Sequence, residues 1–166
     1  MVRGRDGDRT VPGGAAKASG PGEAIDYGPL ADWVGFNLRM AQAAAFQAFS
    51  RLAKEIGTRP GRFATLMLIG RNPGISQTAL SRANGRDKSS LTPVLNDLER
   101  RGLILRRRTR NDQRAYRLTL TPAGKKLLAQ LTRCARAHER NLDRVIGARK
   151  QKDFVRVLKR IIRRVG

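Results

Sequence analysis

The sequence has one cysteine, one histidine and few aromatic residues, and each shortage excludes a class of protein. A single cysteine cannot form a disulfide within the chain. The lone histidine, with no nucleophile–base constellation and no glycine-rich phosphate loop beside it, argues against an enzyme, a metal site or a bound cofactor. An aromatic content of 5% is too low for the stacking platforms on which single-strand binders hold unpaired bases.

Long apolar runs are also missing. No stretch of about 18 apolar residues occurs, as a transmembrane helix would require. Residues 1–14 lack the apolar centre of a secretory signal. We therefore expect a cytoplasmic protein that does not contact a membrane.

Positive charge, in contrast, is in large excess. The chain of 166 residues carries 35 lysines and arginines against 13 acidic residues, a formal net charge of +22. Eight arginines and one acid, Asp112, fall between Arg100 and Arg117. A packed core cannot absorb so many cations, and solvated surfaces usually mix both signs, so this segment is expected to face a polyanion. The charge alone would also suit an architectural protein that packs DNA without regard to sequence.

The chain is organised around a helix predicted at residues 87–101. Asp87 is typical of an N-cap, because its carboxylate can accept from the free amides of the first turn. Gly102 follows Arg100 and Arg101, which is the usual order of residues at a helix C-terminus. The buried stripe of this helix is expected to consist of Leu91, Val94, Leu95 and Leu98.

A short β-hairpin is predicted after this helix. Its strands are expected at residues 103–108 and 115–119, joined by a polar tip at Thr109–Arg114. Thr121 and Pro122 then provide the cap and the first residue of another helix. A helix followed by a basic hairpin is the arrangement of a winged DNA-binding module, whose helix enters the major groove while the hairpin reaches the backbone or the minor groove.

Helices are predicted on both sides of this module. A long helix at residues 29–56 is apolar on most of its circumference, which favours burial by a second copy, a ligand or both. Short helices at 63–69 and 77–83 follow, the second capped by Ser76, and the second completes a helix-turn-helix. A helix from Thr121 to Ile146 completes the set before Gly147 interrupts it.

The last helix separates apolar from charged residues. Its apolar residues are Phe154, Val157, Leu158, Ile161, Ile162 and Val165. The opposite face carries Arg149, Lys150, Lys152, Arg156, Lys159, Arg160, Arg163 and Arg164. The apolar face cannot remain in water, so the helix is expected to pair with the same helix of another copy.

The expected fold is mainly α with a small β-hairpin wing, a winged helix-turn-helix that forms a homodimer through a helical dimerisation region. Residues 1–27, rich in glycine, proline, alanine and charge, are expected to be a disordered tail. Residues 28–58 and 121–166 are assigned to the dimerisation region. Residues 59–120 are assigned to the DNA-binding domain.

Three motifs resemble those of the MarR family of transcription regulators over about residues 29–165. They are DLERRGLI at 97–104, DQR at 112–114 and LTPAG at 120–124. The resemblance implies a homodimeric repressor that binds palindromic double-stranded DNA and is released by a small, often aromatic and anionic ligand. The segment GFNLRMAQAAAFQAF further resembles a subgroup that senses hydroxycinnamic or related aromatic acids, some as coenzyme A thioesters.

Candidate DNA contacts lie off the apolar stripe of the helix and in the hairpin. Those of the helix are Lys88, Ser89, Ser90, Thr92 and Asn96. In the hairpin, Arg114 is assigned to the minor groove with Asp112 paired to it, and Arg110 to a phosphate. The chain departs from the family at Pro93, where many members carry an arginine. Proline removes the amide that would bond to Ser89, and with it a candidate base-reading cation is lost.

Candidate ligand contacts are the aromatic and sulfur-containing residues of the first helices, with one arginine. They are Trp33, Phe36, Arg39, Met40, Phe63 and Met67. Arg39 beside aromatic residues suits a carboxylate or a phosphate. The alternative is ordinary core plus a surface arginine. Cys134 is interpreted as a buried inert thiol, and His138 has no partner in the sequence with which to bind a metal.

Overall fold

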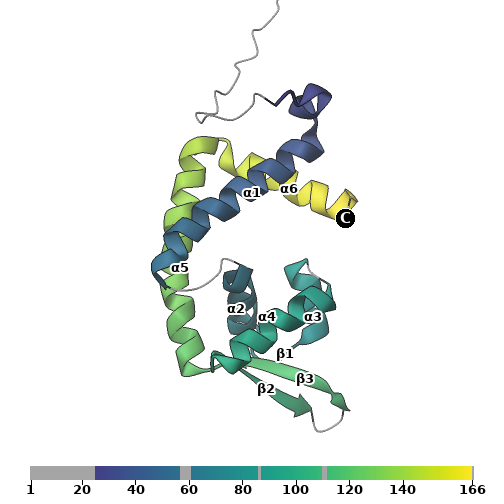
Figure 1. Cartoon of the computed structure of the whole chain (residues 1–166), viewed down its shortest axis with the longest axis vertical. Coiled ribbons are helices and arrows are strands. Elements are labelled where there is room, and N and C mark those ends of the chain that lie inside the picture. The colour runs from purple at the N-terminus through teal and green to yellow at the C-terminus, as the bar shows by residue number, and fades with distance from the viewer. Residues whose placement is uncertain (1–24, 57–60, 86, 110–111, 166) are drawn as a thin grey trace, which may run out of the picture.

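The structure is a computed structural model that describes residues 25–56, 61–85, 87–109 and 112–165, apart from the side chains of residues 55, 109 and 112–115. Most of the predicted disordered tail lies outside these residues. Helix α5, Pro122–Ile146, runs along one side of the molecule and joins its two ends (Figure 1). A compact module of helices and strands lies at one end of α5. The other end carries two extended helices, α1 and α6.

The first helical segment is broken rather than continuous, so the prediction of one helix at residues 29–56 is wrong. The structure has a 3₁₀ helix η1 at Gly28–Asp32, helix α1 at Val34–Ala53 and a 3₁₀ turn η2 at Lys54–Ile56. The break falls at Trp33, whose ψ of 126° is extended. The side-chain amide of Asn37 donates to the carbonyls of Ala31 and Trp33, which stabilises the break.

The helix-turn-helix forms from α2 (Gly61–Arg71), α3 (Gln77–Asn84) and α4 (Lys88–Arg100). The predicted N-caps are confirmed. Ser76 Oγ accepts from the amide of Ala79 at 3.2 Å, and Asp87 Oδ1 accepts from the amide of Ser90 at 2.7 Å. Gly85 ends α3 with a φ of 62°, a left-handed conformation that favours glycine.

Three strands form one antiparallel sheet in the order β1-β3-β2. They are β1 at Ile75–Ser76, β2 at Ile104–Thr109 and β3 at Asp112–Leu120. The predicted hairpin tip at Thr109–Arg114 was too long, because Thr109 pairs with Asp112 and β3 begins there. The ladder therefore extends three residues further toward the tip than the alternation at 115–119 indicated.

The hydrophobic core lies where the sheet, α2–α4 and the first half of α5 meet. Leu91, Leu95 and Leu98 are fully buried, as the stripe on α4 predicted, while Val94 is half-buried. The start of α5 packs closely on the start of β2. A Cβ at Gly124 would overlap the backbone carbonyl of Leu103, so only glycine fits there without movement.

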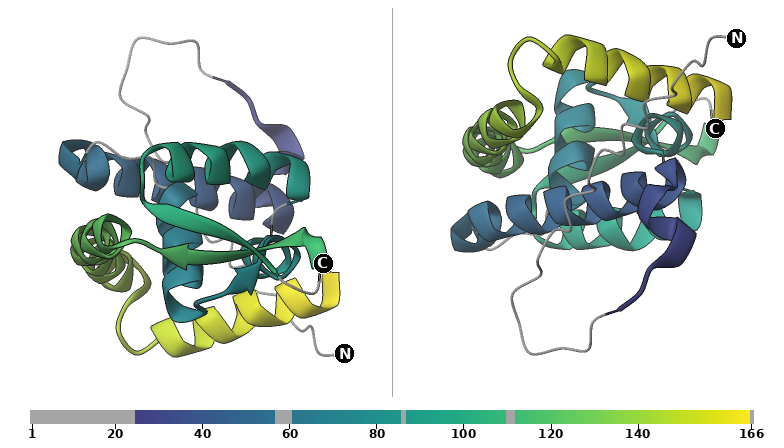
Figure 2. Two further views of the ribbon diagram at one scale, coloured as in Figure 1. Left: turned by 90° about the horizontal axis from the view of Figure 1, so that it is seen from below. Right: turned by 90° about the horizontal axis from the view of Figure 1, so that it is seen from above.

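Helices α1 and α6 leave most of their apolar surface exposed in the single chain. Only Phe49 and Ala53 of α1 are buried, so the expected burial by several neighbours is not met within one chain. Helix α6, Gln151–Val165, has no buried residue. The views along the molecule in Figure 2 show α1 and α6 lying apart, so neither helix covers the other. Among the described helices, none is long and apolar enough to cross a membrane.

Candidate DNA interface and ligand cavity

The first turn of α4 presents a row of short polar side chains to solvent. Lys88, Ser89 and Ser90 are all exposed. The Asp87 carboxylate accepts from the Ser89 hydroxyl at 2.6 Å as well as from the Ser90 amide. These bonds stabilise the charged form and lower the pKa of Asp87 to about 2. The turn is thus fixed by its own cap: both serine hydroxyls donate to Asp87, and Lys88 adds an exposed cation beside them.

Thr92 connects the two helices of the helix-turn-helix. Its hydroxyl donates to the carbonyl of Lys88 at 2.7 Å and accepts from Nε2 of Gln77, on α3, at 2.9 Å. The side chain is half-buried. Because these two bonds already engage the Thr92 hydroxyl as donor and as acceptor, it is less available to contact a DNA base. The helix continues through Pro93, although that residue offers no amide to Ser89.

Asn96 is exposed but held by the wing, the hairpin formed by β2 and β3. Its Oδ1 accepts from a guanidinium nitrogen of Arg106 at 2.6 Å, and Nε of Arg106 lies 3.1 Å from a carboxylate oxygen of Glu99. The Asn96 amide nitrogen remains available as a donor. It suits acceptors such as guanine N7 and O6 or thymine O4, whereas the two-bond pairing of asparagine with adenine would compete with Arg106.

Arg106 was missed as a distinct functional residue, because the sequence presented it as one of eight similar arginines. Its side chain is 13% exposed. The register pairs it with the buried Leu118, so both lie on the inner face of the sheet. Strand alternation from the buried Ile104 would have placed Arg106 inward.

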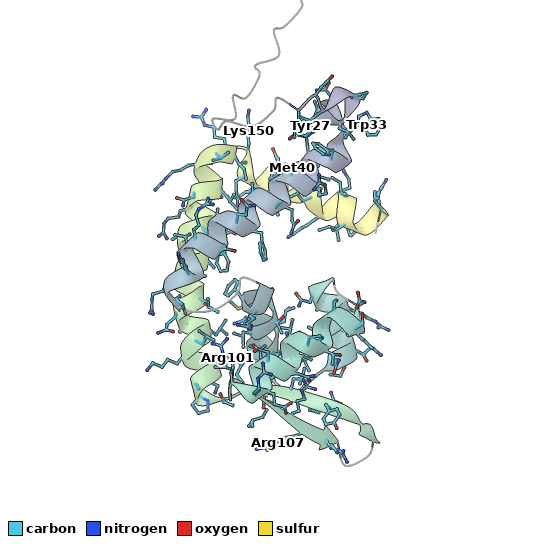
Figure 3. All side chains as sticks on the ribbon, viewed as in Figure 1. Tyr27, Trp33, Met40, Arg101, Arg107 and Lys150 are labelled. Atoms are coloured by element: carbon cyan, nitrogen blue, oxygen red, sulfur yellow. The ribbon has the colours of Figure 1, made fainter. Side chains whose placement is uncertain are left out.

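The outer face of the wing is cationic. Arg107 pairs with Arg117 across the ladder, and both side chains are exposed. Arg117 donates to the carbonyl of Gly74 at 3.1 Å, which ties β3 to the turn before β1. Arg108 lies over the ring of Tyr116, 5.9 Å from its centroid. Figure 3 shows Arg107 at the wing end of the molecule.

The three hairpin residues assigned to DNA stay predictions. Arg110 lies outside the described residues, as do the side chains of Asp112 and Arg114. The backbone places Asp112 at the first position of β3 and Arg114 within that strand. Arg114 therefore belongs to the ladder rather than to the turn.

An acidic residue at the end of α4 fixes this module to α2. Asp97 forms an ion pair with Arg62, whose guanidinium nitrogen lies 2.6 Å from Oδ2, and its Oδ1 accepts from Arg100 at 3.0 Å, while Arg101 lies 4.0 Å away. The Arg62 and Asp97 side chains are about four-fifths buried. Removing the partner of a desolvated carboxylate of this kind costs several kcal/mol. Asp97 therefore holds α4, which we call the reading helix because its side chains are expected to read the DNA bases, against α2.

The six candidate ligand residues do not line one cavity in the single chain. Trp33 is 60% exposed and Met40 is 42% exposed, both at the end far from the wing (Figure 3). Arg39 lies over the ring of Phe36, 5.1 Å from its centroid. Phe63 and Met67 of α2 line separate cavities. The set divides into an exposed group on α1 and a group on α2.

A cavity of about 280 Å³ opens between α1, α2 and α5. It is lined by Gln42, Ala45, Phe46, Phe49, Phe63, Ala64, Ala135, His138 and Glu139. A neighbouring cavity of about 510 Å³ shares Phe63, Ala135 and Glu139 with it and adds Thr132, Arg136, Arg140 and Asp143. The aromatic walls suit an aromatic ring, and the two guanidinium groups can pair with an anionic end beside the carboxylates of Glu139 and Asp143.

His138 is the polar group at the back of this region. The side chain is 8% exposed, and its ring packs edge-on against Phe49 with centroids 5.7 Å apart. Nδ1 is buried and has no hydrogen-bond partner among the described residues. Such a nitrogen is costly unless a ligand or a water satisfies it. His138 falls on the apolar stripe of this helix with Leu127 and Leu131 in the sequence, which agrees with its burial, but the sequence indicated no role for it beyond that of a poor metal ligand.

The thiol and the metal predictions concern the same helix. Cys134 is half-buried rather than fully buried, and its thiol donates to the carbonyl of Leu52 at 3.4 Å. Within the described part of the chain, no three histidine, cysteine or acidic residues gather as a metal site would need.

Comparison with known proteins agrees with this geometry. The sequence pattern of the MarR family matches residues 59–116. A relative from Thauera aromatica, described as a putative transcriptional regulatory protein for the hcr operon, is 36% identical over 138 residues, which cover 82% of this chain and 83% of the relative. The transcriptional repressor CouR bound to a 23-mer DNA duplex superposes with a TM-score of 0.77 at 29% identity, covering 84% of this chain and 99% of CouR. CouR bound to p-coumaroyl-CoA gives a TM-score of 0.78 at 28% identity, covering 85% and 99%.

Proposed function

This chain belongs to the MarR family of transcription regulators and is not an enzyme, and from this premise we propose that it is a repressor released from a palindromic operator by an anionic aromatic ligand. The observation that carries the proposal is the joint surface of α4 and the wing. There the exposed Lys88, Ser89 and Ser90 lie beside a cationic hairpin. A helix with short polar groups reads base edges, and flanking cations hold phosphates.

The palindrome follows from a homodimer built on α1 and α6. Their exposed apolar residues include Val34, Phe46, Phe154 and Ile162. An interface in which two copies use the same surface has a twofold axis, so each copy presents one reading helix to one half-site. Helix insertion into successive major grooves then requires a spacing of about 34–36 Å between the two reading helices.

The ligand is an aromatic carboxylate or its coenzyme A thioester. Support comes from the cavity between α1, α2 and α5, where Phe49 and Phe63 offer apolar walls. His138 Nδ1 offers a buried hydrogen-bonding group to the ligand's ring substituent, and Arg136 and Arg140 stand where its anionic end would emerge. The binding of p-coumaroyl-CoA by CouR adds a neighbour of the same fold with such a ligand.

Release of the protein from DNA requires that the ligand bind one geometry of the dimer more tightly than the other. A ligand acts only if it binds better to the arrangement whose reading helices miss the groove spacing. The cavity touches α1, α2 and α5, which connect the dimer end with the DNA-binding module. An occupant there can change the angle between the two parts.

The test is a titration of a DNA complex with p-coumarate, p-coumaroyl-CoA and free coenzyme A. A duplex selected from random sequence by the protein serves as operator, and release is followed by fluorescence anisotropy. We expect the aromatic compounds to release the duplex and coenzyme A to fail. If no aromatic acid or thioester binds or shifts the protein from DNA, the ligand part of the proposal is wrong and the repressor part stands alone.

Two variants separate the two candidate ligand positions. His138→Leu should weaken the response about tenfold, since a hydrogen bond to a buried polar group contributes about 1.4 kcal/mol. Arg39→Ala tests the exposed group on α1, and each variant's affinity for DNA without ligand provides the control. A response that depends on Arg39 but not on His138 would move the ligand to the α1 surface.

A further inference from the structure

Helix α6 carries a second cationic surface that the reading of an operator does not use. This C-terminal basic face consists of Arg149, Lys150, Lys152, Arg156, Lys159, Arg160, Arg163 and Arg164. All eight side chains are exposed. Asp153 is the only acid among residues 147–165, and it pairs with Arg156 at 3.0 Å.

The charge of this face exceeds that of the DNA-reading module. Residues 147–165 contain eight cations and one acid, a net +7 over 19 residues. Residues 87–121 contain nine cations and four acids, a net +5 over 35 residues. In that module Asp97 pairs with Arg100 and Glu99 pairs with Arg106. The larger net charge of the two therefore lies on residues 147–165, which comprise the turn before α6 and α6 itself.

The arrangement along the helix is regular. Lys152, Arg156, Lys159 and Arg163 follow one another at steps of four, three and four, so they project from one side of α6. Like charges at these spacings destabilise a helix. A polyanion that neutralises these cations would relieve this repulsion and stabilise the helix. If the face only contacted water, neutral or acidic residues would suit it better.

The basic face cannot assist the wing from a distance. Figure 3 shows Lys150 and Arg107 at opposite ends of the molecule. The 25 residues of α5 between the two ends span about 37 Å at 1.5 Å per residue. Screening reduces electrostatic effects beyond about 8 Å at physiological salt. The charge on α6 must therefore act on a partner that touches α6.

We propose that the C-terminal basic face binds a second DNA duplex, so that the protein bridges two segments of DNA. The face from residue 149 to residue 164 extends about 22 Å, the length of about six base pairs. Duplex DNA presents one charge per about 1.7 Å of its axis and releases condensed counterions to such a surface. A second copy of this face is excluded as the partner, because like charges repel.

A membrane surface fits the helix less well than DNA. Membrane-bound amphipathic helices insert their apolar face beneath the headgroups. In α6 the apolar residues Phe154, Val157, Ile162 and Val165 are exposed in the single chain. The proposed homodimer buries this apolar side against a second copy, so it is not free to enter a membrane, and the basic face is the part of α6 left exposed. Bridging rests on the proposed function in two respects, because α4 and the wing hold the first duplex and the homodimer covers the apolar side of α6.

The experiment measures capture of a second duplex by the full chain. A biotinylated 40-base-pair duplex is immobilised, protein is added, unbound protein is removed, and a fluorescent duplex of the same sequence is supplied. Retained protein and retained fluorescence are both recorded. The wild-type protein should retain the fluorescent duplex. The triple variant Lys159→Gln, Arg160→Gln, Arg163→Gln should reduce this capture at least tenfold and leave protein on the first duplex.

The matched control removes three exposed cations elsewhere, in the variant Arg51→Gln, Lys54→Gln, Lys126→Gln, and should capture as wild type does. Sedimentation confirms that both variants keep the wild-type assembly. Equal capture by the α6 variant and wild type overturns bridging through α6. Protein retained without capture by wild type overturns bridging alone, whereas no retention overturns the operator proposal as well. Preferential capture of phosphatidylglycerol vesicles or of RNA hairpins over the second duplex also overturns the bridging proposal.

Discussion

At the level of single residues, Lys88 and Asn96 occupy positions that suit two different contacts with DNA. Lys88→Ala should lower the affinity for every duplex and reduce the slope of log affinity against log salt by about one per half-site, because a phosphate contact is lost. Asn96→Ala should cost about 1–3 kcal/mol at one base pair and relax the preference there. Anisotropy titrations on operator and on random duplex compare the two. Equal losses on both duplexes for Asn96→Ala would exclude direct base reading.

Asp87 gives the stability of α4 a specific dependence on pH. Its pKa lies near 2 in the folded chain, below the ordinary value of 3.8. The carboxylate therefore stabilises the fold at pH values above about 4, and this contribution is lost as the pH falls toward 2. Thermal melts of wild type and Asp87→Ala should differ at pH 7 and converge between pH 4 and pH 2. The variant Ser90→Ala, which keeps the carboxylate and its bond to the backbone amide, is the control.

The sequence predicted much of the reading helix, α4, but few of the hydrogen bonds that join it to other elements. The caps at Ser76, Asp87 and Thr121 are local, because each side chain bonds to an amide three residues ahead. The bonds from Gln77 to Thr92 and from Arg106 to Asn96 join separate elements. Their partners depend on how α3, α4 and the sheet pack, which no local pattern specifies. The two-residue strand β1 was missed for the same reason.

At the scale of elements, the minor-groove contact of the wing is predicted to depend on a single arginine. Arg114→Ala should weaken operator binding about tenfold or more and leave the melting temperature unchanged, since its side chain is assigned to the minor groove of the DNA and not to the core. Operator titration and a thermal melt measure the two effects. Arg107→Ala, which removes an exposed cation from the opposing strand, shows how much of any loss is general charge. Wild-type affinity in Arg114→Ala would refute the minor-groove assignment.

The junction of β2 and α5 is predicted to tolerate no side chain. Gly124→Ala should destabilise the chain by about 1–3 kcal/mol despite the better helix propensity of alanine, because the new Cβ meets the backbone carbonyl of Leu103, which cannot rotate away. Gly35→Ala in α1 is the matched control. Nothing lies within 4 Å of its Cβ position, so it should stabilise by about 0.5–1 kcal/mol. Urea denaturation compares both variants with wild type.

The break in the first helical segment shows where periodicity misleads. Apolar residues continue at helical spacing through residues 30–56, yet the backbone leaves the helix at Trp33. The carbonyls freed there are satisfied by Asn37, a residue that the apolar pattern does not count. Exposure of the same surface also explains why ligand contacts were hard to predict. Trp33 and Phe36 looked like part of a pocket, yet the cavity between α1, α2 and α5 is lined instead by Phe46 and Phe49 from later in α1.

At the scale of the whole molecule, assembly is predicted to depend on the last helix. Deleting residues 148–166 should yield a monomer or an insoluble chain, because α6 contributes exposed apolar residues such as Phe154 and Ile162 to the proposed dimer interface. Sedimentation velocity at several concentrations measures the state. The α6 triple variant, which changes only cations, serves as the control and should remain a dimer. A truncated chain that sediments as a stable dimer would assign the main contact to α1 instead.

Helix α5 has one more consequence, because it is a single uninterrupted rod between the dimer end and the reading end. A rod about 37 Å long that tilts by about 10° about its middle displaces each end by about 3 Å, close to one base-pair step of about 3.4 Å. Ala135, His138 and Glu139 lie near the middle of this rod, beside the cavity with α1 and α2. A flat ring inserted there works as a wedge close to the pivot of a lever. A ligand only a few ångströms thick can therefore move a reading helix out of register with the major groove of the DNA.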